Sequence, residues 1–136
     1  RLSGPLLDRI DLHVEVARPD RIPGSVPGSA SGAVPECSAL VRLRVVAARE
    51  RQLARAGMPN AHLEGAQLRE HCRLDALSRR FLEEAAQRVG LSPRACQRIL
   101  KVARTVADLE GSTEIAGDQL AEAIAFRGID CENRQG

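Results

Sequence analysis

SPRACQRILKVARTVADL, residues 92–109, is the stretch that decides the fold of this 136-residue chain. Ser92 is suited to cap the start of a helix, because its hydroxyl can accept a hydrogen bond from an N–H group of the first turn. Pro93 suits the first helical position, where an N–H group is not needed. Gly111 is a typical residue just beyond a helix end. The stretch therefore predicts a long helix that runs from Pro93 to about Leu109.

This predicted helix has an apolar and a basic side. Four apolar residues recur at steps of three and four, and so share one face: Ile99, Val102, Val106 and Leu109. Small residues allow close approach of a neighbour: Ala95, Ala103 and Ala107. The other side carries Arg94, Arg98, Lys101 and Arg104. We expect a core helix with a cationic rim.

Arg94 occupies an unusual place in the first turn of this helix. A cation there opposes the helix dipole, which favours negative charge at the N-terminus. A solvated arginine is the common explanation. The alternative is that Arg94 and the helix start together face an anion.

Composition and charge narrow the class of protein. The chain holds two Phe and no Trp or Tyr, so its core must be built from aliphatic residues, which suits packed helices. The net charge of +2 is too small to indicate a nucleic-acid partner by itself, and the positive excess lies in residues 37–56. The four cysteines lack zinc-site spacing, and no stretch resembles a signal peptide or a membrane span. We expect free thiols, no metal, no membrane and a cytoplasmic location.

Residues 38–127 carry the pattern of a compact bundle of about four to five helices. Ser38 is predicted to cap a helix that ends near Ala56, and Leu63–His71 is predicted as a short helix. Asp75 is predicted to cap a helix that ends at Gly90 and buries an i, i+4 stripe: Leu77, Phe81, Ala85 and Val89. The last helix is predicted to begin near Asp118 and to bury Leu120, Ala123 and Ile124.

The flanking segments differ from the bundle. Residues 1–17 predict a short helical turn followed by a strand over 10–16, where apolar and polar residues alternate. A single strand needs a sheet partner, which the chain does not otherwise offer. Residues 18–37 are rich in Pro, Gly and Ser and predict a flexible linker, and residues 128–136 predict a disordered tail. The first residue is not Met, and we expect the chain to be a piece of a longer protein.

Catalytic signatures of nucleotide hydrolysis are missing from the sequence. The chain has no glycine-rich phosphate loop and no hydrophobic strand that ends in paired acids for Mg²⁺. Its three histidines have no spacing typical of metal ligands. Cys96 falls on the inward arc of the long helix, which favours a buried structural thiol over a nucleophile.

Several motifs together resemble one family, the magnesium-chelatase-like AAA+ ATPases of the ComM/YifB type. The stretch SGPLLDRIDLHVEV, residues 3–16, resembles the end of the AAA+ core of these proteins. Four further motifs resemble the family's C-terminal part in the same order: NAHL at 60–63, LREHCRL at 68–74, LSPRA at 91–95 and ARTVADL at 103–109. The resemblance implies the C-terminal lid domain of such an ATPase, with the last core strand attached.

The family resemblance also implies roles for two arginines. Arg9 matches an arginine finger that acts on the nucleotide of the neighbouring subunit. Arg94 matches the sensor-2 arginine, which opens a lid helix and touches nucleotide phosphates. Arg104 lies too deep in the helix for that role, and we expect it to pair with Asp108 one turn later.

For the parent protein, the resemblance implies a homo-hexamer that uses ATP and Mg²⁺ to remodel DNA or drive branch migration, in competence or another process. It implies no porphyrin substrate. The fragment alone is expected to hold no cofactor and to be inactive.

An alternative reading of the chain involves no nucleotide at all. Residues 38–56 place Arg44, Arg51 and Arg55 on one face of a helix, where they could contact DNA or another subunit. The chain would then be a helical DNA-binding or protein-interaction module. The lack of aromatic residues counts against a stacking platform for single strands. A solvated arginine face is the commoner explanation for these three residues, and a third reading of the chain is a purely structural interaction domain.

Overall fold

The computed structural model describes residues 9–14, 16 and 36–127, and in this part the chain is all helical. The elements are α2 (Ser38–Ala56), a 3₁₀ turn η1 (Asn60–His62), α3 (Gly65–His71), α4 (Ala76–Val89), α5 (Pro93–Glu110) and α6 (Gly117–Ala125). The predicted all-α class is confirmed. None of these helices has the length and apolar content that crossing a membrane requires.

The ends of α5 follow from local sequence signals, as predicted. The Ser92 hydroxyl accepts a hydrogen bond from the N–H of Ala95 at 3.1 Å, and Pro93 is the first helical residue. Gly111 ends the helix with φ of 78°, a left-handed conformation that glycine adopts without strain. Asp75 likewise caps α4 by accepting from the N–H of Ser78. Ser38 does not cap α2: the helix begins at Ser38 itself, and Cys37 precedes it without a side-chain cap.

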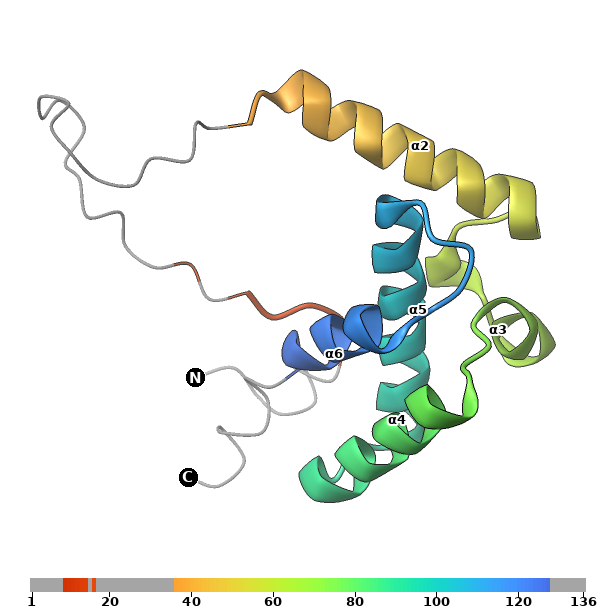
Figure 1. The fold of residues 1–136 in the computed structure, drawn as a ribbon, viewed down its shortest axis with the longest axis vertical. Coiled ribbons are helices and arrows are strands. Elements are labelled where there is room, and N and C mark those ends of the chain that lie inside the picture. Colours follow the sequence, from red (N-terminus) through yellow and green to blue (C-terminus); the bar gives the residue numbers. More distant parts are fainter. Residues whose placement is uncertain (1–8, 15, 17–35, 128–136) are drawn as a thin grey trace, which may run out of the picture.

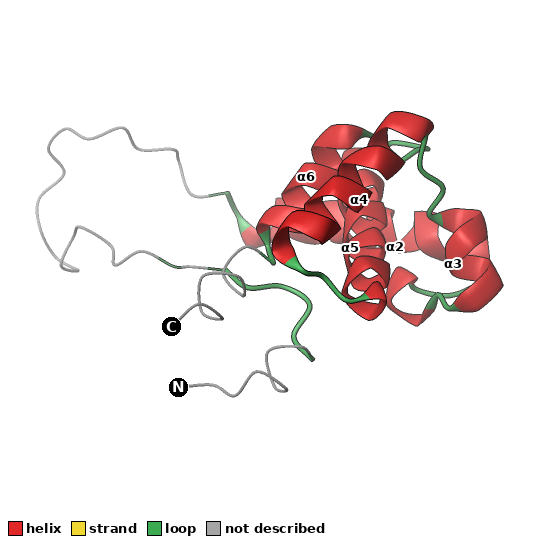
Figure 2. Cartoon of the chain, turned by 90° about the horizontal axis from the view of Figure 1, so that it is seen from below, coloured by secondary structure: helices red, strands yellow, loops and turns green. Residues whose placement is uncertain are grey.

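The core forms around α5, which runs through the middle of the molecule with α2 across one end and α4 near the other (Figure 1). Seen from below, α4, α5 and α6 cluster together, with α3 set to one side (Figure 2). As predicted, Leu120 and Ala123 of α6 face inward. The buried apolar cluster comprises Leu63, Leu68, Cys72, Leu82, Ile99, Ala103, Ile115, Leu120 and Ala123.

Helix α4 packs by a different face from the one that its sequence predicts. Leu77 is 78% exposed and Phe81 is 42% exposed, whereas Ser78 and Leu82 are buried. The predicted stripe is therefore wrong as a core face. The small side chain of Ser78 allows its face of α4 to approach the core. An apolar stripe at i, i+4 spacing does not by itself show which neighbouring element covers that stripe.

The predicted strand over residues 10–16 is also wrong for the described residues of that segment. Residues 9–14 form a turn and extended chain, and Leu12 and Val14 are exposed. One backbone hydrogen bond joins the segment to the end of α6, from the N–H of His13 to the carbonyl of Phe126 at 3.1 Å. The described part of the chain contains no strand with which this segment could pair, so its alternating pattern does not produce a strand. The predicted turn, linker and tail lie outside the described residues, except for Arg9 at the end of the turn and positions 36 and 37 of the linker.

Candidate functional site

Arg94, the predicted sensor-2 residue, is the second residue of α5 and is exposed. The neighbouring donors are already used: Ala95 donates its N–H to the Ser92 hydroxyl, and Cys96 donates to the Ser92 carbonyl at 3.0 Å. Arg94 itself forms no hydrogen bond or ion pair with any other described residue. Its guanidinium group is therefore available to a ligand outside the chain.

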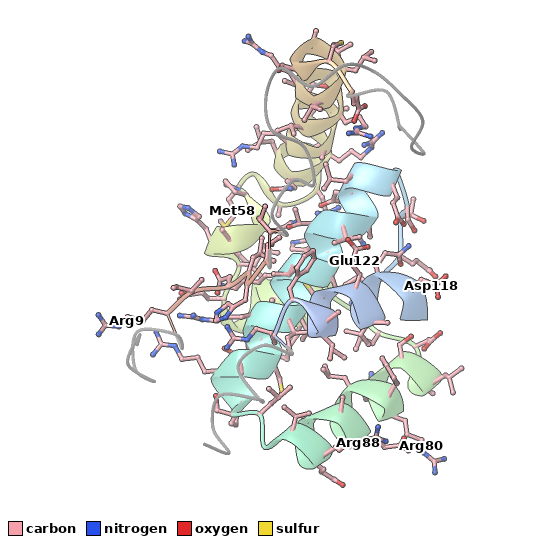
Figure 3. The ribbon with its side chains drawn as sticks, turned by 90° about the vertical axis from the view of Figure 1, so that its left-hand side faces the viewer. Arg9, Met58, Arg80, Arg88, Asp118 and Glu122 are labelled. Carbon is pink, nitrogen blue, oxygen red and sulfur yellow. The ribbon has the colours of Figure 1, made fainter. Side chains whose placement is uncertain are left out.

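Arg9, the predicted arginine finger, belongs to the segment that passes beside α5 and α6. Its side chain is exposed and extends away from the helices (Figure 3). The segment is held by an ion pair between Asp11 and Arg98, with 3.2 Å between Oδ1 and Nη1. Arg98 follows Arg94 by four residues and so lies on the same side of α5. The ion pair thus brings the segment that carries Arg9 to the N-terminal half of α5.

Arg127 provides the second attachment of this segment. It is buried just after α6 and donates a hydrogen bond from Nη1 to the carbonyl of Ile10. Sequence reasoning had placed Arg98 on a cationic rim and had given Arg127 no role. Neither residue has a sequence signal for this contact, because the partners are more than 80 positions away along the chain.

The three arginines of α2 that sequence reasoning put on one face do share a face, and in the second half of α2 that face lies toward α5. Arg51 donates from Nη1 to the Asp108 carbonyl at 2.6 Å. Arg55 donates from both terminal nitrogens to the two carboxylate oxygens of Asp108, each at 2.7 Å. Arg44, nearer the free end of α2, pairs with Glu36 at 2.6 Å. All three cations therefore have acceptors within the chain.

Asp108 is the centre of a buried polar network between α2, η1 and α5. Its carboxylate also accepts from the Asn60 amide at 2.8 Å and from Arg104 at 3.1 Å. The predicted pair between Arg104 and Asp108 is confirmed. Arg104 is almost fully buried, however, and so does not belong to a cationic rim. Its terminal nitrogens Nη1 and Nη2 also donate to the carbonyls of Thr113 and Ser112 in the loop after α5.

Asn60 was not singled out from the sequence, although it completes the network. It is buried, its amide group binds Thr105 at 3.1 Å as well as Asp108, and its Oδ1 accepts from Arg55. The NAHL and ARTVADL motifs supply three of the network's main members, because Asn60 belongs to the first and Arg104 and Asp108 to the second. These motif residues shape the domain from inside.

The network has a clear electrostatic balance. Burial disfavours the ionised form of Asp108, but hydrogen bonds from Arg55 and Asn60 and the nearby charges of Arg104 and Arg55 outweigh it and lower the pKa of this carboxyl. The hydrogen bond to Asp108 raises the pKa of Arg55. Two guanidinium groups thus face one carboxylate, which fixes the angle between α2 and α5.

Cys72 and Cys96 are not suited to act as reactive thiols. Burial raises the pKa of Cys72 to about 11 and also raises the pKa of Cys96. Both are poor nucleophiles at neutral pH, because the thiolate is the reactive form. Among residues 9–14, 16 and 36–127, no group of three or more His, Cys, Asp or Glu side chains could hold a metal ion.

Known proteins match this chain along nearly its whole length. The family described as "Magnesium chelatase, subunit ChlI C-terminal" matches residues 35–127. YifB of Salmonella typhimurium is 47% identical over 130 residues, and YifB of Escherichia coli is 46% identical over 132 residues; each match covers 96% of this chain. The competence protein ComM of Haemophilus influenzae is 46% identical over 129 residues, 95% of this chain. The chain spans 25% of the length of each of these relatives.

Proposed function

The chain belongs to the magnesium-chelatase-like family of ComM and YifB. We propose that it is the C-terminal lid of an AAA+ ATPase in which Arg94 senses nucleotide. The exposed Arg94 guanidinium, free of described partners at the start of a capped helix, carries the proposal. An arginine in the first turn is tolerated when an anion lies between it and the helix N-terminus.

The Arg94 guanidinium fits a phosphate contact, but Arg94 alone is not a complete nucleotide site. The guanidinium fork suits phosphate oxygens. The sequence offers no phosphate loop and no Mg²⁺-binding acids, so the remaining contacts to ATP and Mg²⁺ would come from polypeptide outside residues 1–136. The lid would then change its position with the state of the nucleotide, because Arg94 is fixed to the rigid helix α5.

Arg9 is proposed as the arginine finger that acts on a neighbouring subunit. It extends from the segment that Arg98 and Arg127 hold against the helices, so it can reach a partner without rearrangement of the core. This role requires an assembly of several copies, and we propose a cytoplasmic homo-hexamer. The name of ComM supports a role in competence, and we propose DNA as the substrate of the parent protein.

The alternative, a DNA-binding or protein-interaction module that involves no nucleotide, loses part of its support. Arg51 and Arg55 are bound to Asp108, which leaves them fewer donors for phosphates of DNA. Arg44 is bound to Glu36 at the surface and can exchange partners at little cost. A DNA or subunit contact through Arg44, Arg51 and Arg55 stays a prediction.

ATP hydrolysis by the full-length protein tests this function. Arg94→Ala should reduce turnover and weaken nucleotide-dependent closure of the lid, whereas Arg88→Ala, which removes an exposed arginine of α4, should leave both unchanged. The 136-residue chain alone should not hydrolyse ATP. Normal hydrolysis by Arg94→Ala would remove the sensor role, and turnover by the isolated chain would contradict the assignment as a lid.

A further inference from the structure

The first half of α2 extends beyond the body of the molecule. In residues 38–46 every side chain is exposed, and the first buried residue of the helix is Ala48. Figure 1 shows that this end of α2 stands clear of α5, whereas the other end lies against α5 and η1. The structure thus contains about two turns of helix that bury no side chain against the described residues.

This free half-helix, residues 38–46, is more apolar than is usual for a helix that is exposed to solvent. Leu40 is 52% exposed, Leu43 is 66% exposed and Val45 is 53% exposed, and Val41 and Val46 are exposed as well. At 100° per residue, Leu40, Leu43 and Val46 point to one side, and Val41 and Val45 point to another. A helix that is apolar on most of its circumference is normally buried.

Among the described residues, no side-chain cap stabilises the start of this half-helix. Cys37 makes no side-chain cap, and the first turn holds no acidic residue to complement the helix dipole. Short helices without packing are marginal in water. The uncapped, apolar start of α2 is therefore expected to unfold easily in the isolated chain. In the assembled protein we expect a partner to hold it.

The charges of α2 specify the chemistry of that partner. Arg42 and Arg49, seven residues apart, share a face between the two apolar sides, and both are exposed without a hydrogen bond or ion pair to other described residues. Their positions call for carboxylates opposite them. The fitting surface is an apolar groove with acidic side chains along its rim.

The groove between α3, α4 and α5 of a second copy does not match this chemistry. The groove between α3, α4 and α5 has an apolar floor, but its lining contains Arg69, Arg73 and Arg79 against the single acid Glu83. Arg42 and Arg49 would meet charges of their own sign there. This groove is therefore a poor site for α2, whereas the relatives are about four times as long as this chain and include further polypeptide that could form the fitting surface.

We propose that residues 38–46 of α2 dock into an apolar, acid-rimmed groove formed by the parent polypeptide outside this chain. This rests on one part of the proposed function, the existence of that longer polypeptide, and on none of the roles of Arg9 and Arg94. Docking fixes α2, and the Asp108 network passes the position of α2 on to α5, whose first turn carries Arg94.

Hydrogen exchange of the backbone amides tests the docking. In the 136-residue chain, amides of residues 38–46 should exchange rapidly, and in the full-length protein without DNA they should exchange at least about tenfold more slowly. The double variant Leu40→Gln and Leu43→Gln keeps helix propensity and should lose that protection. Leu77→Gln, which alters an exposed leucine of α4, is the matched control and should keep it.

Three results would overturn the proposal. The first is equally fast exchange of residues 38–46 in the chain and in the full-length protein, and the second is protection that survives the double leucine variant. The third is protection that arises only when duplex DNA is added and that disappears in the double variant Arg42→Gln and Arg49→Gln, because the surface would then bind nucleic acid. Loss of ATP hydrolysis in Arg94→Ala together with unprotected residues 38–46 would sink the docking and leave the proposed function standing.

Discussion

Arg55 and Asp108 join α2 to α5 through two parallel hydrogen bonds, each 2.7 Å long, between the guanidinium fork and the carboxylate. The carboxylate is fully buried, and the side chain of Arg55 is only partly exposed. Paired geometry of this kind aligns two groups as well as attracting them. The pair thus makes the angle between the two longest helices a defined property of the domain.

Asp108→Ala should destabilise the domain strongly. It leaves Arg104 buried without its carboxylate and removes the partner of Arg55, a loss typically worth about 3–5 kcal/mol. Urea unfolding followed by circular dichroism measures the change. Glu84→Ala is the control, because Glu84 pairs with Arg80 on the surface of α4 and should cost less than about 1 kcal/mol. If Asp108→Ala does not fold, Asp108→Asn should show a smaller loss of stability that can be measured. Equal losses for Asp108 and Glu84 variants would contradict a structural role for the network.

The same carboxylate should make stability depend on pH in the acid range. Because folding lowers the pKa of Asp108, its stabilising effect is fully present above the ordinary carboxyl pKa of about 4 and is lost as pH falls through the lower folded value. The free energy of unfolding should therefore decrease as the pH is lowered below about 4. Asp108→Asn should show a shallower acid-dependent loss than the unmodified chain, and the remainder should come from carboxyls such as that of Asp75, whose pKa is lowered by the hydrogen bond from Ser78. Identical pH profiles for the two proteins would count against this.

The three cysteines among the described residues should react with iodoacetamide in a fixed order. Cys37 is exposed and should be alkylated first, Cys96 is half-buried and should follow, and Cys72 should react only when the domain unfolds. Burial raises the pKa of Cys72 to about 11, so almost none of it is thiolate near neutral pH. Mass spectrometry of the separate peptides measures each rate, and in urea the three rates should converge. Alkylation of folded Cys72 as fast as Cys37 would show that the groove between α3, α4 and α5 opens readily.

A chain that begins at Cys37 should keep the helical bundle. The described contacts that it loses are peripheral: the ion pairs of Asp11 with Arg98 and of Glu36 with Arg44, the hydrogen bond from Arg127 to Ile10, and one backbone hydrogen bond at His13. The buried cluster and the Asp108 network lie entirely within residues 48–123. Dispersed amide signals in NMR spectra of the shortened chain would bear this out, and a molten product would show that residues 9–16 belong to the folded domain.

The sequence predicts helices in this chain better than it predicts which faces they bury. The limits of α5 depend on Ser92, Pro93 and Gly111, whose effects are local, and they were predictable. The burial of α4 depends on how it meets α6 and the core, and its most apolar stripe, which includes Leu77 and Phe81, faces away. The strand over 10–16 fits its pattern but lacks a sheet among the described residues.

Long-range polar contacts were the hardest to foresee. The i, i+4 pair of Arg104 and Asp108 follows from helix geometry alone, and it was predicted. The contacts of Asp108 with Arg55 and Asn60 span 53 and 48 positions and leave no periodic signal. For the same reason Arg51 and Arg55 looked like a solvent-facing basic surface. Arg9 and Arg94 came from the family resemblance, and their roles stay predictions.

Arg9 should be needed for hydrolysis in the full-length protein but not for nucleotide binding. A finger stabilises charge that develops on the phosphate of the neighbouring subunit, an effect worth roughly 10³–10⁵ in rate in well-studied cases. Arg9→Ala should therefore bind ATP normally and turn over slowly, whereas Arg94→Ala should also impair lid closure. The decisive measurement mixes Arg9→Ala subunits with subunits that lack the lysine of the phosphate loop. Each variant is inactive alone, but at a mixed interface an intact finger meets an intact phosphate loop, so activity should partly return. The control mixes two batches of Arg9→Ala, which should stay inactive. If mixed assemblies form without regaining activity, or if Arg9→Ala alone hydrolyses ATP normally, Arg9 is a surface arginine and the finger must come from another residue.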